Sequence, residues 1–187
     1  MRQVSMMVVA LVSIFANAGA TETNIRTYVL YGQGGPLMSR GMEALAASLE
    51  KMDKRLHVSV HEWKNHKEIA KEIAKLPLET PIVLIGYSLG ANATTWISNA
   101  VPARVIHLVV AYDPSALAEL QPARNNVRRV LLYHNNSPEP FGHGRIKGPQ
   151  VETIETRNSH LVIGNSKWLH QKTRAAVSRV LAELEPR

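Results

Sequence analysis

Ser88 stands in the pattern Gly86-Tyr87-Ser88-Leu89-Gly90, with a glycine two positions away on either side. Residues 82–85 before it are all apolar and rich in β-branched side chains, which predicts a strand buried on both faces of a parallel sheet. Residues 90–93 after it are small, which allows a helix to start close against that sheet. A serine on such a sharp strand-to-helix turn needs neighbours almost free of side chains, and its exposed hydroxyl can act as a nucleophile.

The elements that must position this serine alternate between predicted strands and helices. Strands are expected over residues 25–31, 56–63, 82–85, 105–112, 127–134 and 151–156. Helices are expected after Ser39, over 65–76, from Gly90 to about Ala100 and over 166–185, with loops over 135–150 and 158–161. This alternation predicts an α/β fold, with a mostly parallel sheet of about six strands and helices on both faces. In such sheets, functional groups gather at the carboxyl ends of the strands.

Chemically useful groups follow four of the predicted strands. They are the glycine-rich run Gly32–Gly35, then Ser88, Asp113 and His160. An imidazole can take the proton of a serine hydroxyl and later give it to the leaving group. A carboxylate can hold that imidazole in the correct tautomer and stabilise the imidazolium. These groups together predict acyl transfer through a serine nucleophile.

Ser88, Asp113 and His160 follow one another along the chain in the order serine, aspartate, histidine. This order resembles that of the catalytic residues in the α/β-hydrolase superfamily. Gly86–Gly90 resembles its nucleophile elbow, and Tyr31–Gly35 is similar to the His-Gly-x-Gly-Gly loop of small bacterial lipases, with tyrosine in place of histidine. The resemblance implies a minimal, lid-less serine esterase, lipase or thioesterase that lacks the first two strands of the full fold. It also implies Ser88 as the nucleophile and an oxyanion hole made by the N–H groups of Gln33 and Leu89.

The base and the acid each have an alternative. The family places its base after the last strand, where His160 stands, and His143 in a glycine-rich loop is the alternative base. Asp113 ends an apolar strand, where an unpaired charge would be costly, and the chain's other aspartate, Asp53, precedes Ser88. Many members of the family carry the acid one strand later, which makes Glu139 the alternative acid.

Composition argues against several other functions. The chain has no cysteine, which excludes disulfides, cysteine catalysis and cysteine-ligated metals. We expect no metal site, because His57 and His61 stand four residues apart in a predicted strand and lack a following cluster of ligands. We expect no cofactor, because Gly32–Gly35 lacks the spacing of phosphate-binding loops. The formal net charge is +7, but the basic residues are scattered along the sequence, so we expect no nucleic-acid partner.

The N-terminus resembles a secretory signal peptide. Arg2 precedes an apolar stretch over residues 6–16, and Ala18-Gly19-Ala20 fits a small-residue cleavage site. The stretch is too short to span a bilayer as a helix of the mature chain, and no later segment is long and apolar enough. We therefore expect export to the periplasm or the medium, cleavage near Ala20, and a single domain over residues 21–187.

The sequence thus predicts an exported serine hydrolase. It would cleave a small-molecule carboxylic ester or thioester through an acyl-serine intermediate, without a cofactor. The alternative is a non-catalytic binding protein on the same scaffold, because Tyr31 replaces the family's histidine and the acid is open between Asp113 and Glu139. Hydrogen-bond reach between Ser88 and a histidine discriminates the two.

Overall fold

The computed structural model describes residues 23–139 and 141–185, so the predicted signal peptide over residues 1–20 lies outside the described residues. The strands are β1 (Ile25–Tyr31), β2 (Leu56–Glu62), β3 (Ile82–Tyr87), β4 (Ile106–Tyr112), β5 (Val130–Asn135) and β6 (Val151–Thr156). The helices are α1 (Gly35–Met38), α2 (Arg40–Glu50), η1 (Trp63–Asn65), α3 (His66–Lys75), α4 (Leu89–Ala100), α5 (His160–Ile163) and α6 (Lys167–Glu183).

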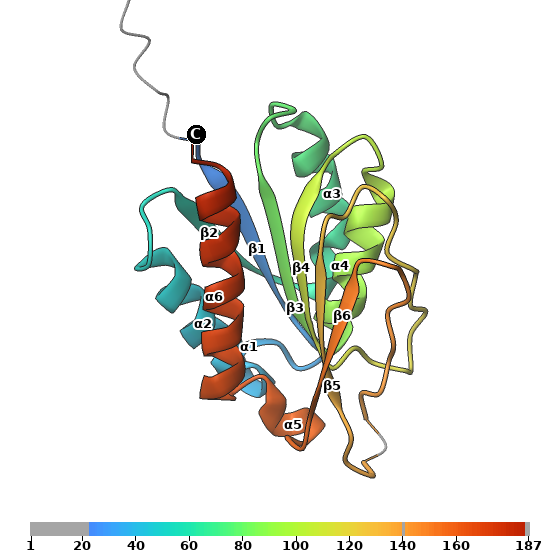
Figure 1. Ribbon diagram of the computed structural model, residues 1–187. Coiled ribbons are helices and arrows are strands. Elements are labelled where there is room, and N and C mark those ends of the chain that lie inside the picture. Colours follow the sequence, from blue (N-terminus) through green and yellow to red (C-terminus); the bar gives the residue numbers. More distant parts are fainter. Residues whose placement is uncertain (1–22, 140, 186–187) are drawn as a thin grey trace, which may run out of the picture.

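The strands form one six-stranded sheet in the order β2-β1-β3-β4-β5-β6, and every neighbouring pair is parallel. Helices α2 and α6 cover one face of the sheet, and α3 and α4 cover the other (Figure 1). The predicted α/β class, the number of strands and the two helical layers are confirmed. Where the sequence predicted a mostly parallel sheet, the sheet is parallel throughout.

The apolar runs of the sequence explain the middle of the sheet. Strands β3, β4 and β5 are buried along their whole length, as expected of parallel strands covered on both faces. Alternate side chains of β3 enter different cores. Val83 and Ile85 join the core under α2 and α6, whereas Ile82 and Leu84 join the core under α3 and α4.

Three local expectations differ from the structure. Strand β5 begins at Val130 rather than at residue 127, and Val127 makes only an isolated bridge to Ile106. Trp63, expected at the end of a strand, opens the short helix η1. His160, expected in a loop, is the first residue of α5, because the carbonyl of Ser159 accepts hydrogen bonds from the N–H groups of Val162 and Ile163.

The strand order places a natural site between β1 and β3. From β1 the chain moves outward to β2, then returns to the other side of β1 and continues through β3 to β6. Ligands bind outside the carboxyl ends of parallel strands where the order reverses in this way. Within the described residues, no helix has the length and apolar character needed to cross a membrane.

Candidate active site

Ser88 sits on a strained turn between β3 and α4. Its backbone has φ 55° and ψ −123°, a left-handed φ that a residue with a side chain rarely adopts. The N–H of Ser88 donates to the carbonyl of Tyr112 at 2.9 Å, which fixes the turn on β4. A Cβ on Gly86 would overlap the carbonyl of Gly90, and one on Gly90 would overlap the carbonyl of Leu30. Both glycines of the motif are therefore required by close backbone packing.

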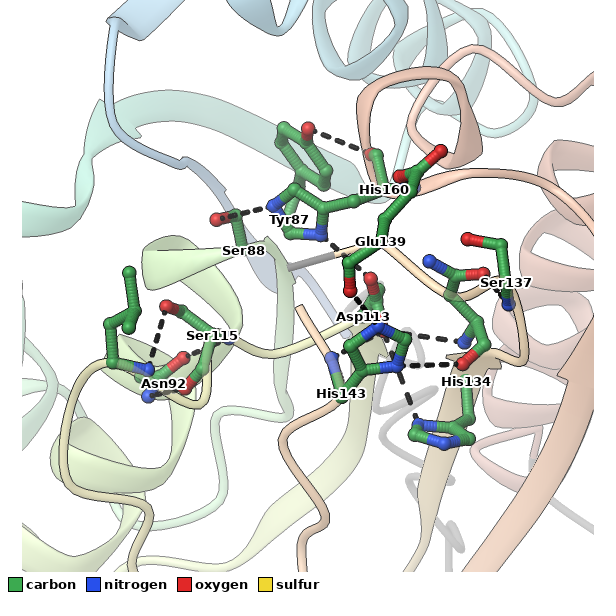
Figure 2. Close-up of polar contacts among 12 residues, drawn as sticks. Tyr87, Ser88, Asn92, Asp113, Ser115, His134, Ser137, Glu139, His143 and His160 are labelled. Atoms are coloured by element: carbon green, nitrogen blue, oxygen red, sulfur yellow. Dashed lines mark hydrogen bonds and ion pairs between the residues drawn. The ribbon is translucent and has the colours of Figure 1, made fainter. Parts of the chain in front are cut away.

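A continuous hydrogen-bonded chain joins Ser88, His160 and Asp113 (Figure 2). The Nε2 atom of His160 lies 3.0 Å from the Oγ atom of Ser88, and Nδ1 lies 2.6 Å from Oδ2 of Asp113. The three residues follow β3, β4 and β6, so the ends of three strands bring them together. All three are buried, with 8% of Ser88, 0% of Asp113 and 6% of His160 exposed.

The buried carboxylate of Asp113 is held by three donors. Besides the ring of His160, the backbone N–H groups of Asn135 and His143 donate to Oδ1 at 3.2 and 3.1 Å. Backbone donors stabilise a carboxylate that has lost its water. Asp113 itself has φ 43°, so a second strained residue stands in the site. Strain of this kind persists only where the surroundings hold the residue in place.

The two alternative candidates lie beside the site but in other roles. The carboxylate of Glu139 accepts from the backbone N–H of His160 at 2.9 Å and has no hydrogen bond to its ring. The ring nitrogens of His143 lie 3.1 Å from the carbonyl oxygen of Asn135 and 2.6 Å from that of Glu139. The atom within reach of Ser88 Oγ belongs to His160, and the carboxylate at its Nδ1 belongs to Asp113.

Aromatic rings flank His160. The hydroxyl of Tyr87 donates to the carbonyl of His160 at 2.9 Å, and the two rings lie 5.2 Å apart between centroids. Burial, with Asp113 and Glu139 nearby, raises the pKa of Tyr87 to about 12, so the phenol stays a donor at neutral pH. The ring of Phe141 lies 6.5 Å from that of His160. No pattern in the sequence singles out either ring for the site.

The residues predicted to supply the oxyanion donors, Gln33 and Leu89, stand next to Ser88. Gly32 packs against Ser88, so the loop that carries Gln33 begins where the serine side chain stands. Leu89 is the first residue of α4, and the first N–H groups of a helix have no partner within the helix. Among the described residues, neither Gln33 nor Leu89 donates its N–H to another group. The positive end of the α4 dipole adds to the attraction for an anion there.

Tyr31 has a structural role in this protein. Its hydroxyl donates to a carboxylate oxygen of Glu43 in α2 at 2.7 Å, and its ring is part of the core under that helix. Burial, with the hydrogen bond to Glu43, raises the pKa of Tyr31, so it remains a neutral donor. The tyrosine that replaces the family's histidine therefore ties β1 to α2.

Two adjoining cavities open at Gln33 and Leu89. The first, of about 430 Å³, touches Ser88 and His160. Its apolar lining comes from Met38, Tyr87, Leu117, Phe141 and Leu161. The second, of about 580 Å³, extends from the glycine-rich loop toward Glu62, Trp63 and Lys64. The N–H groups of Gln33 and Leu89 therefore have an apolar space on one side and a more polar one on the other.

Asn92 shapes this region from inside α4. Its fully buried amide donates to the carbonyl of Ser115 at 3.0 Å and accepts from the N–H of Ser115 at 2.9 Å. These bonds fix the segment that follows Asp113 and carries Leu117. In the sequence Asn92 is one of several small residues after the serine, and only its polarity at a buried helical position could have indicated the role.

Among the described residues, no group of three or more histidine and carboxylate side chains could hold a metal ion. The site itself presents the hydroxyl of Ser88, the imidazole of His160 and the carboxylate of Asp113 in one hydrogen-bonded chain. A hydroxyl beside an imidazole that is oriented by a carboxylate can form an acyl intermediate.

No family model matches the sequence, and no curated protein matches it. The structure is similar to a solved structure from Xanthomonas campestris pv. campestris, described as a candidate hydrolase of the alpha/beta superfamily. The TM-score is 0.60 at 15% sequence identity, and the match covers 86% of this chain and 100% of that chain. At this identity the likeness concerns the fold. Together with the parallel sheet and the turn that carries Ser88, it shows that the chain has the α/β-hydrolase fold.

Proposed function

We propose that the protein is a serine hydrolase that cleaves a carboxylic ester or thioester. Ser88 is the nucleophile, His160 the general base and acid, and Asp113 the carboxylate that orients His160. The N–H groups of Gln33 and Leu89 receive the oxyanion. The observation that carries the proposal is the unbroken contact from Ser88 Oγ through both ring nitrogens of His160 to Asp113.

The reaction would proceed in two halves. Ser88 Oγ attacks the carbonyl carbon as its proton passes to Nε2 of His160, and His160 then protonates the departing alcohol or thiol. Water attacks the acyl-serine in the second half, with His160 again taking and returning one proton. Each half passes through an oxyanion, and losing one donor to it typically costs ~100-fold in rate.

The apolar cavity of about 430 Å³ beside Ser88 supports a substrate with an apolar group of modest size. Three of its side chains, Leu117, Phe141 and Leu161, are at least half exposed, so the cavity is open on one side. A small ester or an acyl group that extends along the surface suits such a site.

The alternative, a binding protein without catalysis, is less well supported. It rests on Tyr31, which here has a structural role, because its ring packs into the core and its hydroxyl donates to Glu43. A scaffold that only binds has no need for a strained serine beside an oriented imidazole, because such strain persists only where the surrounding structure maintains it.

Labelling with a fluorophosphonate tests the proposal. The wild-type protein should become labelled on Ser88 and should hydrolyse p-nitrophenyl acetate, and Ser88→Ala should abolish both. Ser178→Ala, on the exposed side of α6, is the matched serine control and should keep both. Folded wild-type protein that takes up no label would overturn the proposal.

Export remains part of the proposal, with cleavage near Ala20. The full chain expressed in a bacterial host should yield a protein in the periplasm or the medium whose intact mass corresponds to a start at Thr21. A product that keeps residues 1–20 would contradict it.

A further inference from the structure

We propose that the loop after β5 is a clamp that aligns the acid with the base, and that Glu139 and His143 are its positioning residues. The loop is defined here as residues 135–139 and 141–144, which include Asn135 as the last residue of β5, and is called the acid–base loop. The inference rests on the proposed function, because alignment matters for catalysis only if Ser88 reacts. It assigns a positioning role to Glu139 and His143, the two side chains that the sequence predicts as alternative acid and alternative base.

The acid–base loop lies directly on the bond between Asp113 and His160. Two of its backbone N–H groups, from Asn135 and His143, hold Oδ1 of Asp113. A Cβ on Gly142 would overlap Oδ2 of Asp113 and would stand 2.6 Å from Nδ1 of His160. Only a glycine therefore lets the backbone cover this bond, and the cover keeps Asp113 fully buried.

Glu139 fixes the main chain of the base. Its carboxylate accepts from the N–H of His160 at 2.9 Å, while Tyr87 donates to the carbonyl of the same residue at 2.9 Å. With Asp113 on Nδ1, the residue is held at its N–H, its carbonyl and one ring nitrogen. The remaining nitrogen, Nε2, then points at Ser88 Oγ (Figure 2). Removal of Glu139 takes away one of the three restraints.

His143 fixes the loop that carries Glu139. Its ring contacts the carbonyl oxygens of Asn135 and Glu139, so it joins the start of the loop to the residue that holds His160. The loop is also pinned to the segment after Asp113, because Ala116 donates to Gly142 at 2.9 Å and Gly144 donates to Pro114 at 2.7 Å. His143 has φ 64°, a conformation that persists only under such restraint.

The two side chains proposed to position His160 lie outside the cavities proposed to receive the substrate. Glu139 and His143 line neither of the two cavities at the oxyanion donors. Phe141 and Gly142 of the same loop do line the apolar cavity, so the test needs an ester whose acyl group is too short to depend on that cavity. For such an ester, loss of either side chain should misplace His160 against Ser88 and leave the substrate contacts in place. A misplacement of about 1 Å can cost ~100-fold in rate.

Steady-state kinetics on the full chain test the clamp, with p-nitrophenyl acetate as substrate and fluorophosphonate labelling as a second readout. Glu139→Ala should lower kcat and the labelling rate by about 10- to 100-fold, with KM within about twofold of the wild type. Glu139→Gln should recover most of that loss, because its amide oxygen can still accept from the N–H of His160. Glu152→Ala, which removes a carboxylate in β6 paired with Arg129 just before β5, is the control and should change neither value.

His143→Ala provides an independent arm, should Glu139→Ala fail to fold. It should show the same fall in kcat at an unchanged KM, with a folded circular-dichroism spectrum. The clamp is disproved if these variants keep wild-type kcat and labelling rate, or if Glu139→Gln is as impaired as Glu139→Ala. Wild-type protein that resists labelling would instead disprove the proposed function, so the two failures are distinguishable.

Discussion

Gly32 and Ser88 touch so closely that no side chain fits between them. A Cβ on Gly32 would lie 2.7 Å from Cβ of Ser88 and 3.3 Å from its Oγ. The two residues follow β1 and β3, the neighbouring strands between which the strand order reverses. This contact sets the spacing between Ser88, the proposed nucleophile, and the loop that carries Gln33, one of the proposed oxyanion donors.

Gly32→Ala should therefore impair the reaction more than the fold. The added methyl must push Ser88 or the glycine-rich loop aside, and we expect kcat/KM for a short ester to fall by ~100-fold. The thermal midpoint should fall by only a few degrees, because the strain is confined to the strand end. Esterase kinetics and a melting curve on the same sample measure both.

Gly164→Ala is the matched control for that substitution. A Cβ on Gly164 would meet the ring of Tyr87 at 3.6 Å, which is an ordinary van der Waals contact. This variant should keep wild-type kinetics. Equal losses in the two variants would show that any added methyl near the site is harmful, and the specific role of Gly32 would be refuted.

The sequence predicted the strands and the strand-end residues well because both follow from local pattern. Apolar runs identified β3 and β4, and the rule that strand ends meet at one edge of the sheet selected Ser88, Asp113 and His160 as neighbours. The structure brings these three within hydrogen-bond distance.

The contacts of loops were beyond local pattern. Glu139 and His143 were recognised as possible acid and base from their position, but whether a side chain in a loop meets a ring or a backbone N–H depends on the loop's path. That path is fixed by bonds such as those from Asn135 and His143 to Asp113, which join residues 22 and 30 positions apart. The periodic patterns that reveal strands and helices in a sequence carry no information about such distant hydrogen-bonded pairs.

Leu161 should influence the choice of acyl group. It lines the apolar cavity beside Ser88 and is 50% exposed, so its removal should not disturb the core. Leu161→Ala removes apolar contacts that a longer chain can use, at ~0.8 kcal/mol for each buried methylene. We expect the ratio of kcat/KM for p-nitrophenyl hexanoate over the acetate to fall about fivefold. Leu78→Ala, an exposed leucine outside the cavity, should leave the ratio unchanged, and a ratio that stays constant in Leu161→Ala would contradict the assignment.

Thr173 should be important for stability. Its buried hydroxyl lies 2.6 Å from the hydroxyl of Tyr112 and 3.2 Å from that of Tyr133, and so joins α6 to two strands. Thr173→Val leaves these buried phenols without that partner, which should cost ~1–3 kcal/mol in the free energy of unfolding. Thr173→Ser keeps the hydroxyl and should lose less, as measured by urea unfolding. A valine variant as stable as the serine variant would argue against a role for the hydroxyl.

His107 should make the fold sensitive to mild acid. Burial in β4, with repulsion from Arg128, lowers the pKa of this histidine to about 4. In the unfolded chain its pKa is near 6.5, so between these values the unfolded state binds a proton that the folded state does not. The free energy of unfolding therefore falls as the pH drops from about 6.5 toward 4, by up to ~1.4 kcal/mol per pH unit from this residue.

His107→Gln should flatten that dependence. Glutamine can still accept from the N–H of Ile82, which lies 3.4 Å from Nδ1 of His107, but it takes up no proton. Burial also lowers the pKa of His134 and of His170, so part of the slope should remain. Urea unfolding of wild type and variant at pH 7.0, 5.5 and 4.5 measures the difference, which should widen toward acid in favour of the variant. Parallel slopes for the two proteins would show that His107 is protonated equally in the folded and unfolded states.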